Sequence, residues 1–289
     1  MSLPSKTFRL FLSSTFNDLR AERDALHAKV FPTIREFCAS HGFAFQPIDL
    51  RWGVSFEAGY DQQTMRICLD EVRRCKSHAK PHFAIILGDR YGWIPLPTEI
   101  EQQEFEQISA KIRSLYSADT KEIAYLEQWY RLDRNAIPAV YVLQPRLTKE
   151  DKSDEHWGQV EKTLRNAFAE AIEHLPELSE AQKLKYLASA TEQEIVERLF
   201  NNVNNKDTIH FFSRHFTNIK TLTGAEIAAM VAKDRAYQEQ DSSYRITIKH
   251  FADFRDDALD LARHDKLLAL KDRICQTLPP DNVHPYDLP

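Results

Sequence analysis

Five short apolar runs, separated by stretches of helical spacing, constrain the fold more than any other feature of this chain. Nearly continuous apolar runs are typical of strands covered on both faces, as in a parallel sheet. Alternation of such strands with helices predicts a doubly wound α/β fold whose crossovers are right-handed. The five predicted strands cover residues 8–12, 44–50, 83–87, 209–212 and 283–286.

Apolar residues at helical spacing fill the intervals between these strands. One helix is expected after the first strand and a second before the third strand. A third helix is expected from Ser189 through Leu199, and a fourth over about 256–277. The first two helices are indicated by Leu26, Val30, Ile34 and Phe37, and by Met65, Cys68, Leu69 and Val72.

The roughly hundred residues between the third strand and Ser189 are too many for an ordinary connection. Most of them show helical spacing, so we expect a large helical insertion at about 96–188, with a candidate strand at 138–143. Residues 7–95 and 189–289 then form the core of a single domain that spans 1–289. Residues 217–250 are expected to be irregular.

Composition excludes several classes of protein. A net charge of −5, with Lys and Arg scattered among acids, gives no electrostatic footprint for nucleic acid. No stretch approaches the ~20 apolar residues that cross a bilayer, so no membrane association is expected. The four cysteines stand singly, which fits a reduced, cytoplasmic location.

Phosphate-cradling loops and metal sites are also not expected. The chain has seven glycines and neither a P-loop nor a dinucleotide-binding glycine motif, which argues against an NTPase or a dinucleotide site within these residues. His78 and His82 have helical spacing, but Pro81 breaks the helix and no third ligand is near, so no metal site is predicted.

Four ordered segments together resemble one family. They are FRLFLSSTFND at 8–18 with AERD at 21–24, IDLRWGV at 48–54, LGDRYGWIP at 87–95 and SATEQEI at 189–195. These segments resemble a TIR-like domain found N-terminal to NACHT and other STAND-type ATPases, including nephrocystin-like and telomerase-associated proteins and bacterial relatives. The resemblance covers about 7–216, with a looser match near Leu270 to Ile274; the insertion departs from the compact pattern.

The resemblance implies a flavodoxin-like fold with strand order 2-1-3-4-5, fused in a longer protein to an NTPase and a sensor. It implies self-association of the full-length protein and a role in immune or antiviral-defence signalling. Some TIR domains cleave the nicotinamide–ribose bond of NAD, whereas others only assemble. The expected function is therefore an assembly or interaction module; the alternative is an NAD(P) or nucleotide glycohydrolase activated by oligomerisation, with NAD as substrate and no bound cofactor.

In open α/β sheets, ligands bind beyond the carboxyl ends of the strands, at the point where the strand order reverses. For the order 2-1-3-4-5 this point lies between strands one and three. Hydroxyls hold ribose or phosphate, Arg clamps phosphate and aromatic rings stack on bases. The candidate ligand-binding residues are Ser13, Ser14, Thr15, Asp49, Arg51, Trp52, Asp89, Arg90 and Tyr91.

The TEQE sequence at 191–194 resembles the T-x-x-E motif of nucleoside deoxyribosyltransferases, in which the glutamate is the nucleophile. The resemblance implies Glu194 as the catalytic carboxylate and Glu192 as the second choice. Such a carboxylate stabilises an oxocarbenium-like transition state, by analogy with glycosidases.

Structural roles compete with these assignments. Ser14 or Thr15 with Asp18 equally fits a helix cap, and the tryptophans fit packing. The acidic and basic residues of the candidate site could also form an ion-pair network that locks loops to the sheet; these are Asp49, Arg51, Asp89 and Arg90.

Overall fold

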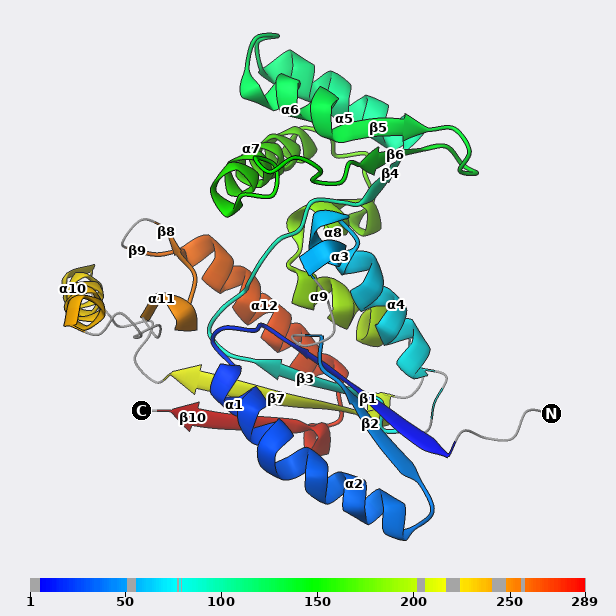
Figure 1. Cartoon of the computed structure of the whole chain (residues 1–289), viewed down its shortest axis with the longest axis vertical. Coiled ribbons are helices and arrows are strands. Elements are labelled where there is room, and N and C mark those ends of the chain that lie inside the picture. Colours follow the sequence, from blue (N-terminus) through cyan, green and yellow to red (C-terminus); the bar gives the residue numbers. More distant parts are fainter. Residues whose placement is uncertain are drawn as a thin grey trace. The chain divides into compact units, whose positions relative to one another are not determined.

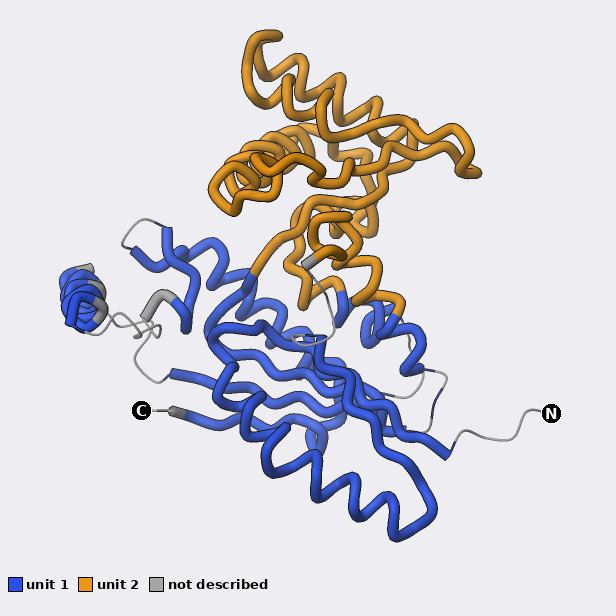
Figure 2. The backbone as a smooth tube through the Cα atoms, in the orientation of Figure 1, with its two compact units in different colours: residues 1–51, 71–92, 194–289 blue, residues 52–70, 93–193 orange. Residues whose placement is uncertain are grey.

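The computed structural model describes residues 6–50, 56–76, 78, 80–201, 206–216, 224–240, 248–255 and 258–288. The chain forms two compact units, shown in different colours in Figure 2. The first unit contains Met1–Arg51, Glu71–Gly92 and Glu194–Pro289, and the second contains Trp52–Asp70 and Trp93–Gln193.

A five-stranded parallel sheet forms the centre of the first unit (Figure 1). Its order is β10-β7-β3-β1-β2, which is the predicted order 2-1-3-4-5, and every neighbouring pair is parallel. The predicted fold class is therefore confirmed. The strands are β1 (Thr7–Ser14), β2 (Ala44–Ile48), β3 (Phe83–Leu87), β7 (Ile209–Phe216) and β10 (Val283–Leu288).

One continuous helical run follows β1 and covers one face of this sheet. It consists of α1 (Arg20–Ala25), the π-helical turn η1 (Leu26–Val30) and α2 (Phe31–Ser40). Phe31 packs in a buried cluster with Leu12 of β1 and Ile86 of β3. The helix α12 (Leu261–Thr277) lies over the opposite face (Figure 1). The reversal of strand order after β2 explains this arrangement, because right-handed crossovers in opposite directions lie on opposite faces.

The other predicted helices are present as α4 (Thr64–Lys76) and as α9 (Ala190–Ile195) with the π-helical turn η2 (Val196–Phe200). The expectation of irregular structure over 217–250 was wrong for α10 (Gly224–Gln240). The described side chains of α10 are mostly exposed and show no buried stripe at helical spacing, although the composition of the segment favours helix. Short elements complete the unit: η3 (Lys206–Thr208), α11 (Ile248–Phe251), β8 (Phe254–Arg255), β9 (Ala258–Leu259) and η4 (Pro280–Asn282).

The second unit contains most of the insertion, and it is not purely helical. A three-stranded antiparallel sheet has the order β4-β6-β5, with β4 (Glu99–Glu101), β5 (Tyr130–Asp133) and β6 (Val140–Leu143). The candidate strand at 138–143 corresponds to β6, whereas its two partners were not expected. The helices are α3 (Phe56–Tyr60), α5 (Gln102–Leu115), α6 (Lys121–Trp129), α7 (Asp154–Glu173) and α8 (Glu180–Leu187).

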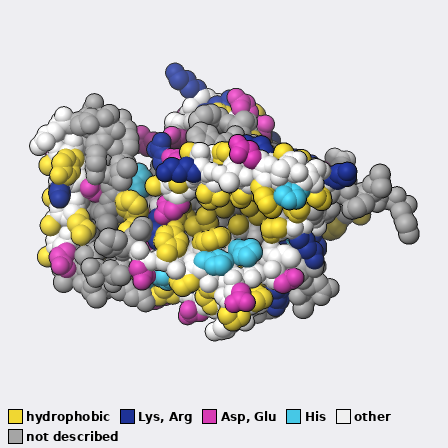
Figure 3. Space-filling view, turned by 90° about the horizontal axis from the view of Figure 1, so that it is seen from below, with side chains coloured by type: hydrophobic (Ala, Val, Ile, Leu, Met, Phe, Trp, Pro, Cys, Tyr) yellow, Lys and Arg dark blue, Asp and Glu magenta, His cyan; other side chains and the backbone are white. Residues whose placement is uncertain are grey.

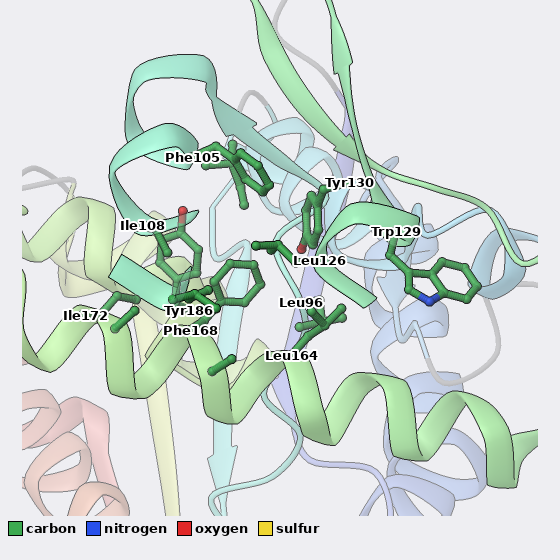
Figure 4. Packing of buried hydrophobic residues seen from close by; sticks show 14 of the residues in the cluster. Leu96, Phe105, Ile108, Leu126, Trp129, Tyr130, Leu164, Phe168, Ile172 and Tyr186 are labelled. Atoms are coloured by element: carbon green, nitrogen blue, oxygen red, sulfur yellow. The ribbon is translucent and has the colours of Figure 1, made fainter. Parts of the chain in front are cut away.

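A large apolar cluster stabilises the second unit (Figure 4). Leu164, Phe168 and Ile172 project from α7 at helical spacing of four residues, and each is at most 3% exposed. Phe168 packs edge-on against Tyr130 and at a tilt against Tyr186. Because this cluster is separate from the core under the central sheet, the second unit has a core of its own.

Part of the central sheet is open on the α2 side. Alternate residues of β7 point to opposite faces: Phe211 is fully buried, whereas Phe212 is 37% exposed. The ring of His284 on β10 stacks 4.8 Å from that of Phe212 and 5.4 Å from that of His210. We call His210, Phe212 and His284 the open face. Seen from below, hydrophobic side chains gather here with histidines beside them (Figure 3).

Candidate functional site

The loops that follow β1 and β3 meet at the carboxyl edge of the sheet, where the strand order reverses. Gly92 has a φ of +94°, which suits glycine, and a Cβ atom there would lie 2.8 Å from Thr15 Cγ2. Thr15 itself is 8% exposed. The structure therefore brings these two loops of the predicted site together, and their close contact leaves little room for a ligand between Thr15 and Gly92.

Ser13 and Glu194 are in direct contact. The Ser13 hydroxyl donates a hydrogen bond of 2.7 Å to Glu194 Oε2, and the two residues are 0% and 7% exposed. β1 ends just after Ser13, and Glu194 lies in α9. Glu192 lies in the second unit, is half-buried, and its backbone N–H donates to Ser189 Oγ at 3.2 Å.

Ser14 and Asp49 are both held by Arg23 of α1. The Arg23 Nε donates to Ser14 Oγ at 2.6 Å, and Nη1 pairs with Asp49 Oδ1 at 2.5 Å. His27 Nε2 lies 3.0 Å from Asp49 Oδ2. Arg23 is 1% exposed, so this is a buried ion pair with further hydrogen bonds. Asp49 thus has a structural partner from α1.

Arg51 and Trp52 lie outside the described residues. The expectation that Ser14 or Thr15 caps the following helix was wrong. That helix begins at Arg20 after Leu19, and no side chain caps it. The Ser14 hydroxyl instead donates to the Thr15 carbonyl at 3.0 Å.

Arg214 of β7 lies fully buried against the start of α1. Its guanidinium donates to the Asp18 carbonyl at 2.5 Å, to Glu22 Oε1 at 2.7 Å and to Asp18 Oδ2 at 3.3 Å. Burial raises the pKa of Asp18 from 3.8 to about 6. Gly88 is needed beside this group, because a Cβ there would lie 2.5 Å from Asp18 Oδ2 and 3.0 Å from Arg214 Cζ.

Asp89 and Lys271 extend this buried charge network. Asp89 accepts a hydrogen bond of 3.3 Å from the Phe216 backbone, and Lys271 Nζ donates to the Arg214 carbonyl at 2.8 Å. Burial raises the pKa of Asp89 and lowers the pKa of Lys271 to about 8. The network links β3, β7 and α12 at the edge where ligands were expected.

Arg90 and Tyr91 both contact Asp253. The Tyr91 N–H donates to Asp253 Oδ2 at 2.7 Å, and Arg90 Nε lies 3.6 Å from Oδ1. Arg263 Nη1, from α12, lies 3.3 Å from the same Oδ1 atom. The loop after β3 is thus tied to a residue more than 160 positions later.

Several of these partners were missed from the sequence. Arg23 stands within the AERD segment and Lys271 within the looser match near Leu270 to Ile274, so a signal was present for both, whereas Arg214 and Asp253 follow no motif. The sequence signal for them was a charged residue at a strand position or on the inward side of a helix, because a charged side chain that is buried there needs a partner. In the part of the chain that the structure describes, no group of three His, Cys, Asp or Glu side chains could hold a metal ion.

The described residues of the second unit line at least two surface clefts. The larger, of about 380 Å³, is lined by Phe105, Tyr130 and Tyr141, with the Arg113–Glu127 ion pair beside them. The smaller, of about 90 Å³, contains Arg146, which lies over the Tyr60 and Trp157 rings at 4.7 and 5.0 Å. Neither cleft contains a residue of the predicted site.

The wound parallel sheet and its charged carboxyl edge define a doubly wound α/β domain. A family model described as "Domain of unknown function (DUF4062)" matches residues 9–217, and the chain belongs to this family. No solved structure matches the chain significantly. None of the described helices has the length and apolar character needed to span a bilayer.

Three relatives illustrate the context of this family. The chain is 34% identical over 207 residues to mouse "NACHT and WD repeat domain-containing protein 2", and 28% identical over 291 residues to its human counterpart. These matches cover 65% and 94% of this chain, but 12% and 16% of the relatives. Mouse "Telomerase protein component 1" is 39% identical over 141 residues, which is 48% of this chain and 5% of that protein.

Proposed function

We propose that this chain is a TIR-like assembly module of a NACHT-type ATPase, acting in the cytoplasm in immune or defence-like signalling, and that its open face binds a second copy. The relatives that carry NACHT and WD repeat domains in their names support this context. The four cysteines are all free thiols, in keeping with a reducing compartment.

The open face is the observation that carries this proposal. Parallel sheets normally have both faces covered, because their strands are apolar on both sides. Phe212 lies beside the buried Ile86 in the sheet register, yet it is 37% exposed. An apolar side chain in the second strand from the edge, stacked on a neighbouring histidine, favours burial by a partner.

A second copy has an element suited to cover this face. Val30 and Phe37, in the helical run that lies on the same side of the sheet, are 42% and 66% exposed. That run, from Arg20 to Ser40, is about 30 Å long at ~1.5 Å per residue, enough to span the eight residues of β7, which extend about 26 Å at ~3.3 Å per residue. If each copy lays its helix over the open face of the other, the contact is two-fold symmetric and closed.

Sedimentation of the purified chain over a range of concentrations tests this function. We expect a concentration-dependent dimer for the wild type and for Leu147→Glu, a control at an apolar residue that is 73% exposed in the second unit. Phe212→Glu and Val30→Glu should both be monomeric, because a charge would be buried in the contact. A wild type that stays monomeric, or dimers that tolerate Phe212→Glu, would contradict the proposal.

The alternative function is an NAD or nucleotide glycohydrolase with Glu194 as the catalytic carboxylate and NAD as substrate. The contact of Glu194 with Ser13, at the edge where ligands bind in such sheets, favours it. A carboxylate that is 7% exposed and already accepts a hydrogen bond is poorly placed to meet a sugar, so assembly is the better supported function.

A further inference from the structure

Asp253 holds the loop after β3 as a bound anion would. Its Oδ2 atom accepts hydrogen bonds from two consecutive backbone N–H groups, those of Tyr91 at 2.7 Å and Gly92 at 3.2 Å. Successive N–H groups that converge in a turn form a concavity for anions. Gly92, with its φ of +94°, provides the left-handed residue that such a turn requires.

Two arginines flank the same carboxylate. Arg90 Nε and Arg263 Nη1 lie 3.6 and 3.3 Å from Asp253 Oδ1. Both arginine side chains are 28% exposed, whereas that of Asp253 is 8% exposed. Guanidinium groups bind phosphate and carboxylate with similar geometry. A phosphate group would therefore fit between Arg90 and Arg263 as the Asp253 carboxylate does.

The position of this cluster is the one where doubly wound sheets bind ligands. The loop from Asp89 to Gly92 follows β3, and Gly92 touches Thr15 in the loop after the neighbouring strand β1. The strand order reverses between these two strands, which opens the edge to ligands in this class of fold.

The geometry points to a phosphate-binding site made by the Tyr91 and Gly92 N–H groups with Arg90 and Arg263, in which the Asp253 carboxylate is an internal ligand. The external ligand is a small molecule with a phosphate or diphosphate group. Two of its oxygens would replace Oδ1 and Oδ2 of Asp253. This inference is independent of the proposed dimer, since it involves none of the open-face residues.

The backbone around Asp253 is fixed by contacts other than its side chain. Ala252 forms a parallel bridge with Asp89, and the Asp253 carbonyl accepts a hydrogen bond of 2.9 Å from the Asp260 N–H. Only the side chain therefore has to leave the site for an external anion to enter. The Asp253 carboxylate is then a tethered competitor. It reduces the apparent affinity for an external anion in proportion to the fraction of molecules in which the site is open.

Binding of inorganic phosphate and of pyrophosphate, measured by calorimetry at constant ionic strength, tests this site. We expect Asp253→Ala to bind pyrophosphate at least about tenfold more tightly than the wild type, because the competitor is removed. The gain should disappear in Asp253→Ala combined with Arg263→Gln. Asp281→Ala, at an exposed acid in η4, should bind as the wild type does. A preference between the two probes tells a monophosphate from a diphosphate ligand.

A direct readout comes from the amide resonances of Tyr91 and Gly92, which should shift when pyrophosphate is added to Asp253→Ala. The inference is overturned if folded Asp253→Ala binds no more tightly than the wild type, or if the gain survives Arg263→Gln. If Asp253→Ala does not fold, Asp253→Asn keeps an acceptor for the two N–H groups and removes the charge. Equal affinity of Asp253→Asn and the wild type would then overturn it.

Discussion

Ser13 and Glu194 are 181 positions apart, yet a 2.7 Å hydrogen bond joins the Ser13 hydroxyl to Glu194 Oε2. The bond connects the end of β1 to α9, and both residues are buried. Ser13 and Glu194, which the sequence predicted as a ligand-binding and a catalytic residue, thus connect β1 to α9. A measurement of stability and of NAD cleavage distinguishes the structural role from the catalytic one.

Replacement of Glu194 separates these two roles. Glu194→Gln keeps the size of the side chain and an acceptor for Ser13, so we expect a loss of about 1–2 kcal/mol in the free energy of unfolding. We expect no nicotinamide release from NAD by either protein. Glu192→Gln, at the half-buried second choice, should leave stability nearly unchanged. Nicotinamide release by the wild type that Glu194→Gln abolishes would favour the glycohydrolase instead.

Gly88→Ala should destabilise the first unit by about 1–3 kcal/mol, as overpacking does. The added methyl group would meet Asp18 Oδ2 at 2.5 Å, inside a network that cannot move without breaking ion pairs. Gly158→Ala in α7 is the matched control, because a Cβ there meets nothing within 4 Å. It should stabilise the protein by about 0.5–1 kcal/mol. Urea unfolding of both variants measures the difference; equal effects would show that Gly88 is not closely packed.

The raised pKa of Asp18 predicts a pH dependence of stability. Between pH 3.8 and about 6 the folded state binds a proton at Asp18 that the unfolded state has lost, so stability falls as pH rises through this window. Asp18→Asn removes this contribution. The free energy of unfolding of the wild type minus that of the variant should therefore fall by roughly 1–3 kcal/mol across the window. A difference that stays constant or rises with pH would show that the pKa of Asp18 is not raised in the folded state.

Arg23→Lys should lower the free energy of unfolding by about 2–3 kcal/mol. Lysine keeps the charge but cannot bond Ser14 and Asp49 at the same time as Arg23 does. Arg20→Lys, whose side chain is 73% exposed, is the control and should change stability by less than about 0.5 kcal/mol. Equal stability of the two variants, measured by thermal and urea unfolding, would mean that the Arg23 contacts contribute little.

The strands could be predicted because a strand that is buried on both faces is a nearly continuous run of apolar residues in the sequence. The predicted run at 83–87 coincides with β3, and all five residues are buried. The prediction for β7 stopped at Phe212, whereas the strand continues to Phe216. The missed part contains Ser213, Arg214 and His215, which are polar, and the buried Arg214 pairs with Asp18 and Glu22.

Periodicity and short motifs are local properties of the chain, so they were enough to predict the wound parallel sheet, and the family resemblance was enough to predict its strand order. The tertiary structure alone decided which charged groups pair. Arg23 with Asp49, Arg214 with Asp18, and Asp253 with the loop at Tyr91 are contacts between distant segments. Their free energies depend on distance and burial, which no local pattern records, so the open face and the anion-like position of Asp253 emerge only from the fold.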